Sequence, residues 1–169
     1  MRRRKQRGSA ILEFAMAGIA GVTLIISIVQ MGMAMWNYHT MAYAVHETNR
    51  YIASHGRSCT TGGNACSITV GDIVNKLKSY ALGIPDTNMN MTLTSQSGTV
   101  VSCSPVSSCE SDTTQWPPVP HFDNNPGNYT KITGDTTLHV AIIEIWFGAT
   151  GQTASVLKLP ATSNIPTVF

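Results

Sequence analysis

The sequence predicts an α+β protein in which a long N-terminal transmembrane helix continues into a small exported domain with a second helix and an antiparallel sheet. Three observations support this prediction. A basic block is followed by an apolar run over residues 11–36. Apolar side chains recur at helical spacing over residues 70–82. Two later segments, residues 89–94 and 136–147, have the composition and pattern of β-strands.

The N-terminal segment is expected to cross a membrane with its N-terminus in the cytoplasm. Residues 2–7 contain five Lys and Arg residues. The apolar run after them makes a helix of roughly 39 Å, longer than the ~30 Å hydrocarbon layer. Because short basic flanks resist translocation, the rest of the chain is expected outside. Trp36 and Tyr38 are expected at the outer interface.

Glu13 is the residue of this run that an ordinary membrane anchor would not contain. A carboxylate at the centre of a membrane helix costs on the order of 2.5–3.5 kcal/mol, and less near the helix end. One interpretation is that Glu13 lies one turn inside the inner interface and is tolerated beside the arginines. The other interpretation considers its neighbours. Gly8 is followed by the small Ser9 and by apolar residues, with Glu13 at the fifth position and Phe14 at the sixth.

This pattern resembles the processing site of type IV prepilins, and the Glu-Phe pair is most similar to that of the Flp/Tad branch. The resemblance implies that a prepilin peptidase cuts between Gly8 and Ser9, so that residues 1–8 are a leader peptide. In the mature chain Glu13 would lie about 6 Å from the new terminal amine. Glu13 and Phe14 would be assembly residues, with the carboxylate pairing with the amine of a neighbouring subunit and offsetting the burial of both charges.

Composition argues against several function classes. The leader holds five of the eleven Lys and Arg residues, so six basic and nine acidic residues remain, which gives no support to nucleic-acid binding. The sequence contains no glycine-rich phosphate loop, nucleophile elbow or carboxylate cluster. His39 and His46 are seven residues apart, too far for the usual one-turn metal pair. We expect no enzyme, no metal and no cofactor.

Four cysteines follow the membrane segment in two close pairs, Cys59 with Cys66 and Cys103 with Cys109. The space outside a bacterial inner membrane favours disulfides, and four cysteines allow three connectivities. Two local disulfides are the preferred connectivity. A zinc site is not supported, because the spacings are not Cys-x-x-Cys and no histidine lies beside either pair.

The first helix is expected to run without a break over residues 9–55, and its outer half should be the spine of a domain over residues 56–169. Gly56 is a plausible stop. About 110 residues follow the helix, enough for one small domain. A mostly apolar stripe continues at helical spacing past the membrane. It consists of Tyr38, Met41, Ala42, Val45, Asn49 and Ile52.

The second helix is expected over residues 70–82. Thr69 and Asp72 match a capping-box variant, and Gly83 with Pro85 ends the helix.

A β-hairpin is expected next. Met89, Met91 and Leu93 alternate with polar residues in a half-buried strand. Residues 95–98 are interpreted as the turn and residues 99–102 as the returning strand.

Residues 104–128 are expected to form a long exposed loop, because five prolines exclude helix and central strand. Four aromatic residues lie in it or at its end, and docking on the domain is preferred over ligand binding as their role. They are Trp116, His121, Phe122 and Tyr129.

Gly134 and Asp135 are interpreted as a turn before the strongest strand, residues 136–147. This strand is apolar on both faces and is expected to be central, with the long helix on one side. Glu144 interrupts one face and is expected at the sheet rim or paired with a lysine rather than in a catalytic role. The final segment, residues 152–169, contains two prolines and suggests an edge strand or an ordered tail.

The order of these features resembles that of the TadE-like minor pseudopilins of the Tad/Flp pilus system. Residues 2–55 carry most of the likeness. TadF-like and TadG-like neighbours stay open, because residues 46–50 keep only part of an Arg-Glu-x-x-Arg-like stretch. The resemblance implies a pilin-like fold, a bacterial inner-membrane location with the domain in the periplasm or in a pilus, and a role in pilus assembly for adhesion or secretion. The implied partners are a prepilin peptidase, other pilins or pseudopilins, the inner-membrane assembly platform and the lipid bilayer.

The alternative function is an uncleaved single-pass anchor that carries a periplasmic binding or scaffold module. Residues 42–44 also offer an Ala-x-Ala-like site for signal peptidase, but the apolar run before it is much longer than that of a typical signal peptide.

Overall fold

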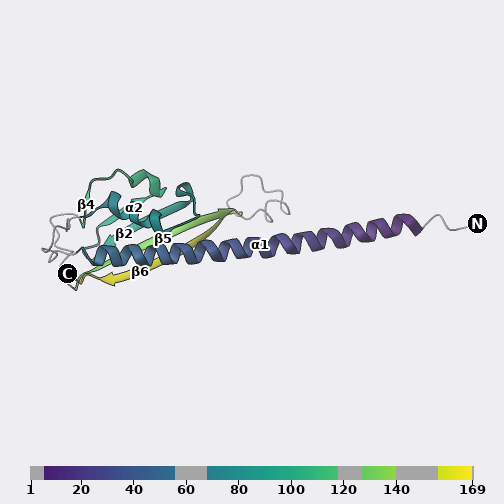
Figure 1. The fold of residues 1–169 in the computed structure, drawn as a ribbon, viewed down its shortest axis with the longest axis horizontal. Coiled ribbons are helices and arrows are strands. Elements are labelled where there is room, and N and C mark those ends of the chain that lie inside the picture. Colours follow the sequence, from purple (N-terminus) through teal and green to yellow (C-terminus); the bar gives the residue numbers. More distant parts are fainter. Residues whose placement is uncertain (1–5, 56–67, 118–126, 140–155, 169) are drawn as a thin grey trace, which may run out of the picture.

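The fold is organised along one helix that extends far beyond the rest of the molecule (Figure 1). A computed structural model describes residues 6–55, 68–117, 127–139 and 156–168, with side chains on the first helix from residue 10. Helix α1 spans Gln6–Ala53 as one 48-residue helix. Its C-terminal half lies along the domain, and its N-terminal half, here called the free half, extends beyond the other described helices and strands (Figure 1). The prediction of one long N-terminal helix that continues into the domain is therefore confirmed.

A four-stranded antiparallel sheet lies beside the C-terminal half of α1. Its strand order is β3-β2-β5-β6, with all neighbouring strands antiparallel. The strands are β2 (Met89–Ser95), β3 (Val100–Cys103), β5 (Tyr129–His139) and β6 (Val156–Pro166). A two-stranded sheet pairs β1 (Ile68–Thr69) with β4 (Gln115–Trp116). The α+β class, the predicted hairpin and the C-terminal edge strand are confirmed.

The hydrophobic core lies between one face of the sheet and the two helices. Met89, Met91 and Leu93 of β2 are buried in it, as the alternation predicts, and belong to the same hydrophobic cluster as buried residues of α1 and α2. A buried amide completes the packing of α1. The Asn49 Nδ2 atom donates to the Thr130 carbonyl oxygen (3.2 Å) and to Ser163 Oγ (3.1 Å). Asn49 therefore ties the spine helix to β5 and β6 at once.

Tyr38, the first residue of the predicted stripe, differs from the later ones in its burial. Its side chain is 43 % exposed, whereas Met41, Val45 and Ile52 of the same stripe are buried. Helical spacing identifies the face on which Tyr38 lies, but it does not show how far along the helix the domain extends.

The predicted turn at Gly134 and Asp135 is wrong, because both residues lie inside β5. Gly134 pairs with Met91 of β2, and Asp135 accepts a hydrogen bond of 2.8 Å from Asn90 on the open face of the sheet. The glycine is required by packing. A Cβ atom at residue 134 would lie only 2.7 Å from Val45 Cγ2.

Helix α2 (Val70–Tyr80) begins as its sequence predicts. The Thr69 hydroxyl accepts from the Asp72 amide, and the Asp72 carboxylate accepts from the Thr69 amide, which completes a capping box. The helix ends slightly before the predicted boundary, and Gly83 follows with φ of +85°. The start of α2 is also held by the segment before β4, because the Val70 and Gly71 amides donate to carbonyl oxygens there at 2.9 Å.

We expect Thr69→Ala to destabilise the domain by about 1 kcal/mol, because an unsatisfied helix N-terminus replaces the cap. Thermal unfolding of the full chain in detergent measures this loss. Ser79→Ala is a matched control on the exposed side of the same helix. An equal loss in both variants would contradict a specific capping effect.

The Thr69 cap should also make stability depend on acid pH. Hydrogen bonds from the Thr69 backbone and hydroxyl hold the pKa of Asp72 below its ordinary value. Asp72 therefore contributes stability that is complete above the carboxyl's unfolded pKa of about 4 and is lost as the pH falls through its lower folded pKa. The difference in the free energy of unfolding between the wild type and Thr69→Ala should therefore become smaller over that acid range.

The described part of the predicted proline-rich loop is more ordered than its composition suggests. It contains the 3₁₀ turn η2 (Val106–Cys109) and β4. Trp116 is 2 % exposed in the core, which agrees with docking as its role. Tyr129 lies at the start of β5, whereas His121 and Phe122 lie outside the described residues.

The predicted local disulfide between Cys103 and Cys109 is present, and both residues belong to the hydrophobic core. Cys59 and Cys66 lie outside the described residues. Residues 140–147 of the predicted central strand, with Glu144, also lie outside them.

Replacing Cys103 and Cys109 together by alanine should destabilise the domain by about 2 kcal/mol, because the unfolded chain regains the entropy of the short loop. Denaturant unfolding under oxidising conditions measures the change. Ser107→Ala alters an exposed position of the same loop and should have little effect. If the double variant and the wild type unfold at the same denaturant concentration, this expectation is wrong.

Candidate assembly surface on the N-terminal helix

The predicted processing residues lie in the first turns of α1. Because α1 begins at Gln6, the bond between Gly8 and Ser9 is part of the helix. A cut at this bond would leave a helix that starts at Ser9 with a free amine. The amine would lie on the same helix as Glu13, roughly one turn away.

Glu13 and Phe14 lie on the free part of α1 and are exposed. Phe14 is 81 % exposed. Within the described residues the Glu13 carboxylate has no ion-pair or hydrogen-bond partner. The structure therefore places both side chains on the exposed surface of the helix, and any partner for the carboxylate would be supplied from elsewhere.

Large apolar side chains surround the free half of α1 on all sides. Their exposed fractions run from 48 % for Met33 to 81 % for Phe14. Among the described residues, α1 is the helix that is long and apolar enough to cross a membrane. Exposing such a large apolar surface to water is energetically unfavourable, so we expect lipid or other helices to cover it.

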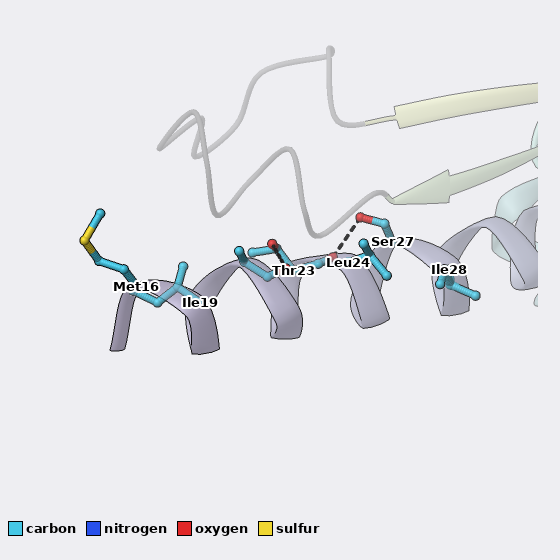
Figure 2. Close-up of a pocket in the computed structure, with 7 residues that line it drawn as sticks. Met16, Ile19, Thr23, Leu24, Ser27 and Ile28 are labelled. Atoms are coloured by element: carbon cyan, nitrogen blue, oxygen red, sulfur yellow. Dashed lines mark hydrogen bonds between the residues drawn. The ribbon is translucent and has the colours of Figure 1, made fainter. Parts of the chain in front are cut away.

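A shallow groove runs along one side of the free helix (Figure 2). Residues at three- and four-residue spacing line it, which is the spacing at which one helix receives the side chains of another. These residues are Met16, Ile19, Ala20, Thr23, Leu24, Ser27 and Ile28. A second groove includes Phe14, Gly18 and Val22.

The hydroxyls in this groove are satisfied within the helix. Thr23 Oγ1 donates to the Ala20 carbonyl oxygen at 2.9 Å, and Ser27 Oγ donates to the Thr23 carbonyl oxygen at 2.8 Å (Figure 2). Both residues can therefore be buried in lipid or against another helix without leaving an unpaired polar group.

The outer half of α1 has a different role. Arg50 and Glu47 bond to each other at 3.2 Å on the surface, whereas Asn49 is buried against the sheet. Sequence reasoning placed Asn49 on the mostly apolar stripe but missed its hydrogen bonds to two strands.

The described residues contain no group of three or more His, Cys, Asp or Glu side chains that could hold a metal ion.

The fold therefore defines the class of protein as a small α+β domain carried on a long apolar helix that could cross a membrane. Residues 8–50 match the family model described as TadE-like protein. Over these residues, which form most of α1, the chain is similar to TadE-like proteins. No curated protein and no solved structure matches the chain significantly.

Proposed function

We propose that this protein is a minor pseudopilin that is cut between Gly8 and Ser9 by a prepilin peptidase and takes part in assembling a Tad/Flp-type pilus for surface adhesion or secretion. The match to the TadE-like family carries this proposal, because the matched region begins at Gly8 and extends through the free helix. A structural role in pilus assembly fits the described residues, which form a long helix with an exposed apolar surface and a small domain.

The free helix supports assembly by packing. Before assembly the bilayer covers its apolar surface. In a pilus the helices of other pilins or pseudopilins replace the lipid, and the inner-membrane assembly platform accepts the chain through the same helix. The Glu13 carboxylate then pairs with the Ser9 amine of a neighbouring subunit, since a carboxylate buried without a cation is costly.

The proposed orientation follows from charge. The leader, with its five Lys and Arg residues, stays in the cytoplasm, and the domain faces the periplasm or becomes exposed on a pilus.

The N-terminal residue of the protein purified from its native membrane tests the processing step. Intact mass and terminal sequencing should show a start at Ser9, and this start should be lost in cells without an active prepilin peptidase. Gly8→Val is a matched variant that should keep the leader when the peptidase is active. A start at Met1 beside an active peptidase would favour a permanent anchor, and a start at Val45 would indicate a released domain.

A further inference from the structure

The structure defines which end of the domain faces the membrane half of α1. Asn49 bonds to Thr130 near the start of β5, whereas Val45 lies against Gly134 further along the same strand. Strand β5 therefore runs back along α1 toward the free helix. The described end of β5 at His139 and the start of β6 lie at the end of the sheet that is nearer the free half of α1 (Figure 1), and we call this the membrane-facing end.

Helix α2 also runs back along α1. The Lys76 ammonium lies 5.3 Å from the Tyr51 ring, and the Tyr80 ring contacts that of Tyr43 with centroids 6.0 Å apart. Helix α2 is thus antiparallel to α1, and its C-terminal end lies toward the free half of α1. Leu82, just beyond α2, lies at the same membrane-facing end of the domain.

This end displays large apolar side chains, and aromatic residues of α1 are exposed at the end of its apolar run. Leu82 is 72 % exposed and Leu157 of β6 is 42 % exposed. Trp36 and Tyr38 are exposed on α1 at the end of its apolar run. We name these four residues the collar.

The length of α1 places the collar at the membrane surface. The apolar run of roughly 39 Å exceeds the ~30 Å hydrocarbon layer but not the ~40–45 Å of the whole bilayer. Its last turns therefore lie in the headgroup layer. Strand β5 continues past Gly134 to His139, which is up to roughly 17 Å toward the membrane. The strand end thus reaches the level of these last turns.

We propose that the membrane-facing end of the exported domain is seated in the headgroup layer of the bilayer, with Leu82 and Leu157 inserted in the lipid beside Trp36 and Tyr38. The occupant of the collar is a phospholipid surface. Aromatic and long apolar side chains are favoured at this depth, where their apolar parts leave water. This contact fixes the height and the tilt of the domain relative to the bilayer, before α1 moves from the membrane into a pilus. The proposal requires that α1 spans the membrane and does not depend on cleavage after Gly8.

Site-specific photo-crosslinking of the full chain in proteoliposomes tests this proposal. Benzoyl-phenylalanine replaces Leu82 or Leu157 in vesicles of phosphatidylethanolamine and phosphatidylglycerol. Val100 is the matched control, since it is 56 % exposed but pairs with Thr94 at the opposite end of the sheet. All three side chains are at least partly exposed, so the probe should not disturb the fold. Mass spectrometry separates lipid adducts from protein adducts.

The expected result is several-fold more lipid adduct at residues 82 and 157 than at residue 100. Equal yields at the three positions would overturn the proposal. Adducts at residues 82 and 157 that join two copies of the chain, in place of lipid, would also overturn it and would make this end a contact between subunits. Leu82→Asp gives a second readout, because it should lower the lipid adduct at residue 157 while near-ultraviolet circular dichroism stays native.

Discussion

Replacing Gly134 by alanine is expected to destabilise the exported domain by about 1–3 kcal/mol, and valine at the same position should cost more. The added Cβ atom would lie 2.7 Å from Val45 Cγ2 and 2.9 Å from Met41 Cε. Such distances are too short for carbon atoms, so α1 would have to move away from the sheet. The Met41 side chain can adjust, but the branched Val45 has little freedom on a helix. Thermal unfolding of the full chain in detergent measures the effect.

A double-mutant cycle separates this clash from other effects of the substitution. Val45→Ala alone should destabilise the domain by removing buried methyl groups. Combined with Gly134→Ala, it should cost less than the sum of the two single changes, because it makes room for the new methyl group. Thr133→Ala, the neighbouring position on the open face of the sheet, is the matched control. Strictly additive losses in the cycle would rule out a direct contact between residues 45 and 134.

Gly134 also shows why part of the fold could not be predicted from the sequence. A Gly-Asp pair is a common turn signal, and the turn interpretation depends on that local preference. Here the glycine is needed by contact with a helix nearly ninety residues earlier in the chain, and Asp135 is paired across the sheet with Asn90. No local pattern records such a contact.

Features that depend on neighbouring residues were predictable. The Thr69–Asp72 capping box is complete within four residues, and the alternation of Met89, Met91 and Leu93 describes the two faces of a single strand. The processing site at residues 8–14 is also inferred from neighbouring residues alone, and it stays a prediction. Strand β4 forms by pairing with the distant β1, so the local sequence pattern misses it.

The largest functional effect is expected for Glu13→Ala, which should abolish incorporation into the pilus while leaving membrane insertion and cleavage intact. Insertion should not suffer, because the change removes a charge that a bilayer disfavours. Cleavage should persist because Gly8 and Ser9 are unchanged. Incorporation should fail because the carboxylate that would neutralise the Ser9 amine of a neighbouring subunit is lost, and that amine would be buried unpaired.

The ratio of protein in sheared pili to protein in the membrane fraction measures incorporation, and terminal sequencing of the membrane fraction confirms cleavage. Glu47→Ala is the matched control, since it makes the same change on the outer half of the same helix, where Glu47 bonds to Arg50. The control should be incorporated normally. Because Glu13 is exposed on the free half of α1, its loss cannot act through the core of the domain. Normal incorporation of Glu13→Ala would therefore mean that the stagger between subunits is set by apolar packing of the helix alone.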